Sequence, residues 1–191
     1  MAKASINFKP IKANSEHHNE RKGENLKYVH SDLTPNNESW KADEIDSKLS
    51  KIQKFCKEVS GRKLQKNAVP IREGLVNLNG HHTMQDLKVL ADELHVKFGI
   101  ECFQIHIHRD EGVSKDKLNY HAHMVFSWQD LNTGKTLKLH RHHMSKIQTV
   151  VASALGMERG ELRENSNRER LEVIEYKAQQ EELRLQELQE Q

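Results

Sequence analysis

Residues 105–111 read Ile-His-Ile-His-Arg-Asp-Glu, and residues 120–124 read Tyr-His-Ala-His-Met. Apolar and polar side chains alternate in both stretches, and this period of two is typical of β-strands with one buried face. The apolar face is expected to hold Phe103, Ile105 and Ile107 of the first strand and Tyr120, Ala122, Met124, Phe126 and Trp128 of the second. The opposite face is expected to hold His106, His108, His121 and His123. If the strands are antiparallel neighbours, these imidazoles form one patch.

Two His-x-His pairs on consecutive strands favour a metal site. Three neutral imidazoles can converge on a divalent ion at about 2.0–2.1 Å and leave positions open for water or substrate. The alternative is a row of solvated sheet histidines that binds no ion.

The composition limits the classes of protein to consider. A chain of 191 residues is long enough for one substantial domain with an appendage. The formal net charge is only +2, so a nucleic-acid surface would have to be local. Cys56 and Cys102 lack zinc-finger spacing, which favours a reducing cytoplasm. Residues 1–10 contain no apolar signal region, and no run approaches the length of a membrane span.

Hydrophobic spacing predicts the remaining elements. Strands are expected at residues 4–9 and 68–78, and helices at 43–59, 84–98 and 142–155. Thr83 is expected to cap the second of these helices, while Gly61, Gly99 and Gly156 follow the three helix ends. Residues 14–29 are polar and form either a weak helix or a loop. This order predicts an α+β fold: a mainly antiparallel central sheet with helices packed on one face and an open site face.

Residues 166–191 are expected to form a C-terminal amphipathic helix. Their apolar residues, Leu171, Ile174, Ala178, Leu185 and Leu188, follow a heptad-like spacing that Glu181 interrupts. Two interpretations stay open: a solvated helix that packs lightly on the body, or the start of a coiled coil that pairs two chains.

Four short patches stand in a fixed order along the chain. They are His18-Asn19-Glu20-Arg21, the basic turn at 61–69, the histidine segment at 108–123, and Gly156-Met157-Glu158-Arg159-Gly160. Together they resemble the relaxases of plasmid mobilization, of the Mob/Pre (MobV-like) type within the HUH endonucleases. The resemblance covers roughly residues 5–165 and implies a relaxase domain at 1–165. The helix expected at 166–191 lies outside the resemblance and is interpreted as the start of a longer region. The loop between Glu111 and His121 is longer than is usual in this family.

The resemblance implies a metal-dependent DNA nickase. Such relaxases cut single-stranded DNA at a plasmid transfer origin by transesterification and keep the 5′ phosphate covalently, which initiates conjugative mobilization. The implied cofactor is a divalent metal ion, Mn2+ or Mg2+. The implied partners are single-stranded or hairpin origin DNA, a coupling protein and accessory mobilization proteins, all in the bacterial cytoplasm.

Roles follow residue by residue from the matched patches. The metal ligands would be His108, His121 and His123, with His106 as a fourth ligand, a substitute or a residue behind the ligands. His18 would be the nucleophile, with Tyr28 as the alternative and His17 as an exposed neighbour. Glu111 would orient or deprotonate the nucleophile, Arg21 would stabilise the phosphorane charge, and Asp110 would be structural. The basic turn would contact DNA phosphates through Arg62, Lys63 and Lys66.

Other functions would share part of this pattern. An HUH replication initiator or transposase usually has its tyrosine on a helix after the His-x-His strand, where this chain offers only Tyr176. A three-histidine metal-binding scaffold without DNA cleavage would not require His18 or Arg21. A DNA-binding module with an inactive site is a third alternative. Two further histidine groups are expected to be surface features: His81 with His82, and His140 with His142 and His143.

Overall fold

A five-stranded antiparallel sheet forms the centre of the fold. The computed structural model describes residues 3–22, 28–161, 182 and 185–186. The strand order is β1-β3-β7-β4-β2, and every neighbouring pair is antiparallel. The strands are β1 (Ile6–Pro10), β2 (Glu38–Lys41), β3 (Ile71–Asn77), β4 (Glu101–His108) and β7 (His121–Ser127). The α+β fold expected from the sequence is therefore confirmed.

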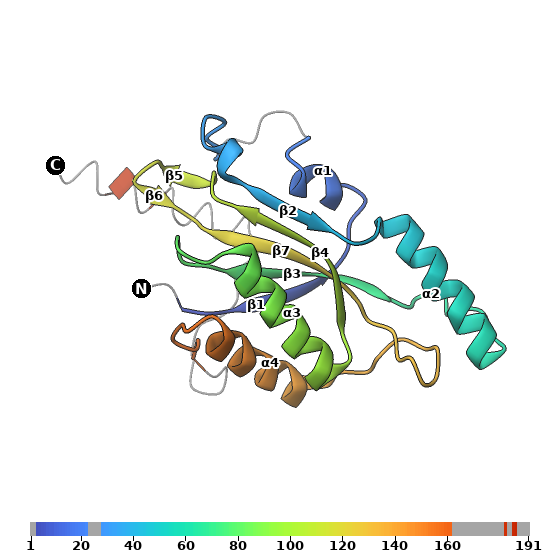
Figure 1. The fold of residues 1–191 in the computed structure, drawn as a ribbon. Helices are drawn as coiled ribbons and strands as arrows, with labels where there is room; N and C mark the ends of the chain where they lie inside the picture. The colour runs from blue at the N-terminus through green and yellow to red at the C-terminus, as the bar shows by residue number, and fades with distance from the viewer. Residues whose placement is uncertain (1–2, 23–27, 162–181, 183–184, 187–191) are drawn as a thin grey trace. The chain divides into compact units, whose positions relative to one another are not determined.

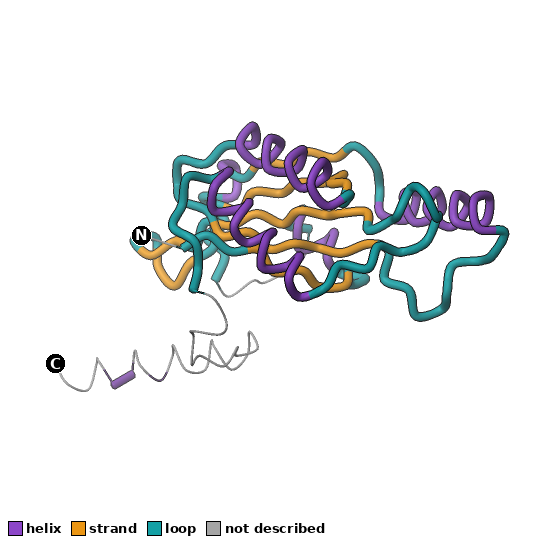
Figure 2. Tube along the Cα trace, turned by 90° about the horizontal axis from the view of Figure 1, so that it is seen from below, coloured by secondary structure: helices purple, strands orange, loops and turns teal. Residues whose placement is uncertain are grey.

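Two helices cover the apolar face of the sheet, α3 (Met84–Phe98) and α4 (Arg141–Ala154). Both lie across the strands in Figures 1 and 2. Their apolar residues bury the expected wall, in which Ile105, Ile107, Ala122, Met124 and Phe126 are 0% exposed. This packing confirms the alternation in both histidine strands from Gln104 onward.

The helix boundaries follow their predicted signals. At the start of α3, the Thr83 hydroxyl accepts a hydrogen bond from the Asp86 backbone N–H, and the Asp86 carboxylate accepts one from the Thr83 N–H. This reciprocal pair satisfies two backbone donors at the helix end. Gly99 ends α3 at a φ of +73°, a left-handed conformation that glycine adopts without steric cost. Helix α2 (Ile45–Ser60) ends in the same way at Gly61.

Phe103 lies on the face opposite to the one expected. The register between β4 and β7 shifts between Cys102 and Gln104, so Phe103 is an extra residue in a β-bulge. It packs with Ile52 of α2, Ile71 and Val125 in a second, smaller core. The prediction of a continuous Phe103, Ile105, Ile107 face is wrong because strict alternation assumes a strand without a bulge.

The sequence did not indicate β2 or the small hairpin of β5 (Gly112–Ser114) and β6 (Lys117–Leu118). β2 is four residues long, pairs with β4 at the sheet edge, and lacks a clear apolar alternation. In the hairpin, a Cβ at Gly112 would stand 2.4 Å from the Lys117 carbonyl oxygen, so this residue must be glycine. The long loop after Glu111 is thus an ordered hairpin.

The second face of the sheet is less open than expected. Helix α1 (Ser15–Asn19) lies over the histidines, and the α2 side chains Ile45, Leu49 and Ile52 pack against this face near Phe103. The sheet histidines are consequently buried, with exposed fractions between 1% and 8%.

The chain divides into two compact units, Met1–Gly160 and Glu161–Gln191. The helix expected at 166–191 lies almost wholly outside the described residues, of which Glu182, Leu185 and Gln186 are helical. Within the described residues, no helix combines the length and apolarity that a bilayer crossing requires.

Candidate metal centre and active site

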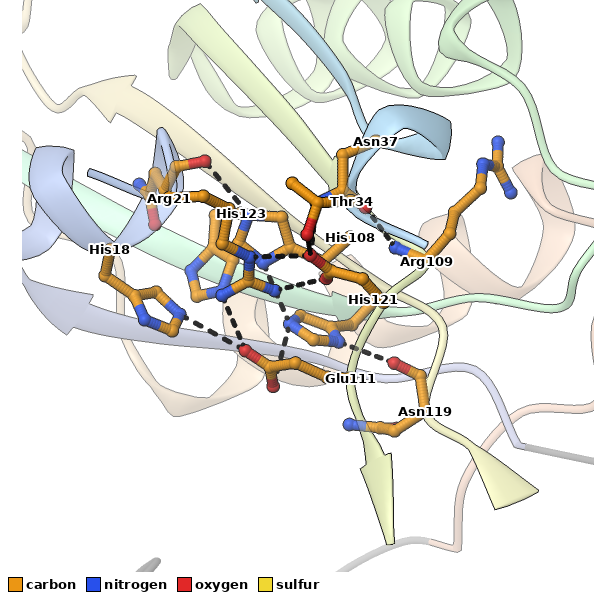
Figure 3. Close-up of polar contacts among 12 residues, drawn as sticks. His18, Arg21, Thr34, Asn37, His108, Arg109, Glu111, Asn119, His121 and His123 are labelled. Atoms are coloured by element: carbon orange, nitrogen blue, oxygen red, sulfur yellow. Dashed lines mark hydrogen bonds and ion pairs between the residues drawn. The ribbon is translucent and has the colours of Figure 1, made fainter. Parts of the chain in front are cut away.

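The register of β4 and β7 brings the four sheet histidines together. His106 stands opposite His123, and His108 stands opposite His121. The rings of His108, His121 and His123 lie close to one another, with centroids 4.9–5.2 Å apart. The three expected ligands therefore share one buried cluster (Figure 3).

Each ring of this cluster has one nitrogen beside an oxygen atom. His108 Nε2 lies 3.0 Å from the Asn19 carbonyl oxygen, and His121 Nδ1 lies 2.7 Å from the Asn119 carbonyl oxygen. His123 Nδ1 lies 3.2 Å from Glu73 Oε1. A carbonyl or carboxylate oxygen can only accept, so we assign the proton to the facing nitrogen in each ring.

These proton positions leave three lone pairs for an ion. The remaining nitrogens are His108 Nδ1, His121 Nε2 and His123 Nε2. His108 Nδ1 and His121 Nε2 are 3.3 Å apart, close to the roughly 3.4 Å that separates two nitrogens bound to one tetrahedral ion at about 2.1 Å. Both ring nitrogens of His123 are buried without a hydrogen bond among the described residues, and Nδ1 is the one that lies beside Glu73. A buried, unpartnered acceptor of this kind fits a divalent metal ion.

Burial keeps the imidazoles of His108 and His121 neutral. Desolvation, reinforced by the neighbouring His123, lowers the pKa of His108 from 6.5 to about 2. The same two causes lower the pKa of His121 to about 4. Neutral rings are the form that binds metal, so His108 and His121 are in the protonation state that a divalent ion requires near neutral pH.

The ligand atoms that lie closest together include two residues outside the sheet triad. One group consists of His18, His108 and His123, and the other of His108, Glu111 and His121; within each group the atoms lie within 4.8 Å of one another. The triad by itself does not form such a group among the described residues. His18 and Glu111 thus lie beside the expected ligands.

Glu111 connects the histidines to Arg21. Its Oε2 lies 3.7 Å from His121 Nε2, and its Oε1 lies 3.8 Å from His18 Nε2. Arg21 Nη1 donates to Oε1 at 2.8 Å. Burial raises the pKa of Glu111, whereas the neighbouring His121, Arg21 and His18 lower it. The lowering effects are larger, so the pKa falls below its usual value and the carboxylate is ionised. The carboxylate is therefore held between two imidazoles and a guanidinium.

Arg21 is itself fixed by Asp110. Its Nη2 and Nε donate to the two carboxylate oxygens of Asp110 at 2.6 and 3.2 Å. Thr34 and Asn37 donate to Asp110 Oδ2 at 2.8 Å each. Arg21 has a φ of +55°, a left-handed conformation that costs energy in a residue with a Cβ. The paired carboxylate thus holds the chain just after α1 in a strained geometry.

The two nucleophile candidates stand on different segments, His18 on α1 and Tyr28 beside the hairpin that follows Glu111. The His18 side chain is 36% exposed, and its ring centroid lies 5.5 Å from that of His108 and 5.0 Å from that of His123. The preceding residue, His17, is exposed. Tyr28 is half-buried, and its carbonyl oxygen accepts a hydrogen bond from the Gly112 N–H at 2.9 Å. Its backbone therefore lies beside the hairpin that follows Glu111.

His106 lies behind the cluster. Its Nδ1 is 3.0 Å from the Ser39 hydroxyl on β2, and burial lowers its pKa to about 4. It belongs to neither group of close ligand atoms. Its position fits a residue behind the ligands better than a fourth ligand.

The basic turn lies away from the histidines. Arg62, Lys63 and Lys66 are exposed in the segment between α2 and β3. The start of β3, Ile71, pairs with Ser127 at the end of β7 opposite to His121. The structure therefore does not bring these three side chains into the cluster.

The other histidine groups have no part in the cluster. His82 is 3% exposed, accepts from the Asn79 N–H through Nδ1 at 2.9 Å, and has Nε2 2.9 Å from the Leu155 carbonyl oxygen. It is a buried structural residue, which corrects the expectation of a surface feature. His140, His142 and His143 lie at the start of α4, where His143 Nδ1 accepts from the His140 N–H.

Glu73 and Asn19 are the site residues that sequence reasoning missed. The Asn19 side chain donates to Glu73 Oε1 at 2.8 Å, so one carboxylate oxygen faces both Asn19 and His123. Burial raises the pKa of Glu73, but His123, Asn19 and His18 lower it further, and the net shift is downward. The available signals were an acidic residue inside the strand expected at 68–78 and, for Asn19, its place in the patch from His18 to Arg21.

Solved structures share this fold over nearly the whole chain. No family model matches the sequence, and no curated protein matches it. Crystal structures of the Mn-bound MobM relaxase domain (MOBV; Mob_Pre) with plasmid pMV158 oriT DNA superpose with TM-scores of 0.69 and 0.70 at 20% identity, covering 93% of this chain and 99–100% of theirs. A third, with a 22-nucleotide strand and a 3′ thiophosphate, has a TM-score of 0.69 at 20% identity and covers 93% of this chain and 98% of its own. This chain has the MobV relaxase-domain fold. The resemblance noted in the sequence is thereby confirmed at the level of the fold.

Proposed function

We propose that this chain is a relaxase that nicks single-stranded DNA at a plasmid transfer origin. The observation that carries the proposal is the juxtaposition of His18 with the buried neutral imidazoles and Glu111, within a MobV relaxase-domain fold. A scaffold that only binds metal would need the sheet histidines. It would not require a solvent-accessible imidazole beside them or the Arg21 guanidinium that Glu111 accepts from.

In this proposal, His108, His121 and His123 hold the divalent ion, Mn2+ or Mg2+. The bound ion would neutralise charge on the non-bridging oxygens of the scissile phosphate. The carbonyl oxygens of Asn19 and Asn119 and the carboxylate of Glu73 would keep each ring in the orientation that exposes its free nitrogen. Mn2+ is the ion in the similar MobM structures.

His18 is the proposed nucleophile. One ring nitrogen, Nε2, faces the Glu111 carboxylate and would carry the proton, so the lone pair of Nδ1 is the one free to attack phosphorus. The N–P bond forms, the P–O3′ bond breaks, and the 5′ phosphate stays on the protein as a phosphoramidate. Glu111 accepts the Nε2 proton, and the departing 3′ oxygen takes up a proton to become a hydroxyl.

Arg21 has two proposed roles. Three of its N–H groups are donated to Asp110 and Glu111, which positions the carboxylate beside His18. A guanidinium has five N–H donors, so further donors can stabilise the charge that develops on the phosphorane. The proposed DNA contacts of Arg62, Lys63 and Lys66 would extend the bound strand to the far end of the sheet.

The biological setting is proposed on the same basis. A chain of this kind would act in the bacterial cytoplasm and deliver the nicked strand to a coupling protein with the help of accessory mobilization proteins. The coiled-coil pairing suggested for 166–191 stays a prediction from sequence.

The direct test captures the covalent adduct. The protein is incubated with Mn2+ and a library of random single-stranded oligonucleotides, and species that survive denaturing electrophoresis are sequenced from the captured 5′ end. We expect one dominant junction sequence, lost in EDTA and in the His108→Ala variant. Tight Mn2+ binding without any adduct would instead favour a metal-binding scaffold or an inactive DNA-binding module.

A further inference from the structure

His18 lies at the position of a metal ligand. Its ligand atom belongs to one close group with those of His108 and His123, all within 4.8 Å of one another. Imidazoles that bind one tetrahedral ion at about 2.1 Å hold their ring centres roughly 5 Å apart. The His18 ring centre is 5.0 Å from that of His123, within the 4.9–5.2 Å of the sheet triad, and 5.5 Å from that of His108, 0.3 Å beyond that range.

The segment that carries His18 is fixed to the same ligands. The next residue, Asn19, is 2% exposed; its carbonyl oxygen accepts from His108 Nε2, and its side chain donates to Glu73. Arg21, three residues after His18, is anchored by Asp110. The position of the His18 backbone beside His108 and His123 is therefore set by the fold.

His18 also differs from the sheet ligands in a way that allows exchange. Its side chain is 36% exposed, whereas those of His121 and His123 are 4% and 10% exposed. It stands on a helix of five residues that covers the sheet, so its ring can turn without disturbing the strand pairing. A molecule that enters from solvent meets His18 before it meets the three buried rings.

We propose that His18 is a ligand of the metal ion in the DNA-free protein and that the scissile phosphate displaces it. This proposal rests on the assignment of His18 as nucleophile. A ring nitrogen bound to the ion has no lone pair for phosphorus, so the nucleophile is protected until DNA arrives. Displacement by a phosphate oxygen frees the imidazole beside Glu111, and cleavage activity is thereby coupled to occupation of the site by DNA.

The experiment compares Mn2+ affinity by calorimetry in the DNA-free wild type and in His18→Ala, with His17→Ala as the matched control. We expect His18→Ala to weaken Mn2+ binding about tenfold or more, as loss of an imidazole ligand does, while His17→Ala changes it by less than about twofold. Equal affinities in all three proteins would overturn the proposal. His108→Ala tests the metal site itself: if it also leaves affinity unchanged, the site assignment fails rather than the role of His18.

A second measurement uses the unmodified protein and so does not depend on a variant that folds. Zn2+ is titrated into 15N-labelled, DNA-free protein while the ring nitrogen resonances are followed. We expect the His18 ring to shift together with those of His108 and His123, and the His17 ring to stay in place. A stationary His18 ring would contradict ligation.

Displacement is tested with the strand selected in the adduct experiment, made with a methylene group in place of the scissile 3′ oxygen. With this uncleavable strand bound, we expect wild type and His18→Ala to bind Mn2+ equally. A tenfold difference that persists in the complex would show a permanent ligand and overturn the displacement. Adduct formation through Tyr28, with His18 still ligating in the absence of DNA, would reject the proposed nucleophile while leaving the ligation intact.

Discussion

Arg21 Nη2 lies 2.6 Å from Asp110 Oδ1, and the two side chains are 8% and 0% exposed. This buried ion pair joins the end of α1 to the turn after β4. It holds Arg21 at a φ of +55° and brings the helix that carries His18 against the histidine strands. Asp110 was expected to be structural, and its four hydrogen bonds agree with that role.

Replacement of Asp110 by asparagine should destabilise the protein strongly. Removing one partner of a buried ion pair leaves the other charge unpaired, which costs about 3 kcal/mol in the free energy of unfolding. Urea unfolding at pH 7 measures the change. The matched control is Asp32→Asn, which breaks the exposed pair with Lys115 and should leave stability unchanged. Equal effects of the two substitutions would contradict a structural role for the Arg21–Asp110 pair.

Glu73→Gln should weaken metal binding without unfolding the protein. The Glu73 carboxylate accepts from Asn19 and faces His123 Nδ1, which orients the ring and makes its Nε2 more basic. Loss of such a partner typically lowers metal affinity about tenfold to a hundredfold. Calorimetric titration with Mn2+ measures it. Glu93→Gln, on α3 across the sheet, is the control; if the two variants bind Mn2+ alike, Glu73 does not support the ligand.

DNA cleavage should stay fast at a lower pH than it would with a histidine nucleophile of unshifted pKa. Burial and the neighbouring His123 lower the pKa of His18 from 6.5, and these effects outweigh the opposing influence of Glu111. The attacking form is neutral, so the rate should rise with pH and reach half its maximum below pH 6.5. Single-turnover rates between pH 4.5 and 8 give the profile. A midpoint at or above pH 7 would be inconsistent with His18 in this environment.

DNA affinity should fall as salt rises if the basic turn contacts phosphates. Each contact with a single strand contributes roughly 0.7 to the slope of log affinity against log salt concentration, because a counterion is released. The triple variant of Arg62, Lys63 and Lys66 to alanine should therefore reduce the slope by about 2. Fluorescence anisotropy between 50 and 200 mM salt, the range over which the effect is large, measures it. An unchanged slope would remove the turn from the DNA surface.

The sequence was most informative where periodicity and capping act locally. The alternation around His106 and His108 predicted one face of β4 correctly, and Thr83 and Gly99 marked both ends of α3. The prediction for Phe103 was wrong because a β-bulge depends on the partner strand, which alternation along one strand cannot show. The sequence did not predict β2 because its four residues owe their conformation to pairing with β4.

The site was predictable in its ligands and less so in their surroundings. The His-x-His spacing indicated His108, His121 and His123, but Glu73 approaches His123 only because β3 lies beside β7. The covering of the site by α1 depends on the Asn19 and Arg21 contacts, which join residues about 90 positions apart along the chain. Long-range contacts of this kind leave no periodic signature in a single sequence.

The identity of the covalent link tests the account most directly. Wild type, His17→Ala, His18→Ala and Tyr28→Phe are each incubated with Mn2+ and the selected strand, and the adducts are exposed to acid. We predict an acid-labile phosphoramidate in wild type, His17→Ala and Tyr28→Phe, and no adduct in His18→Ala. An acid-stable adduct that His18→Ala still forms and Tyr28→Phe does not would contradict the histidine mechanism and identify a tyrosine nucleophile.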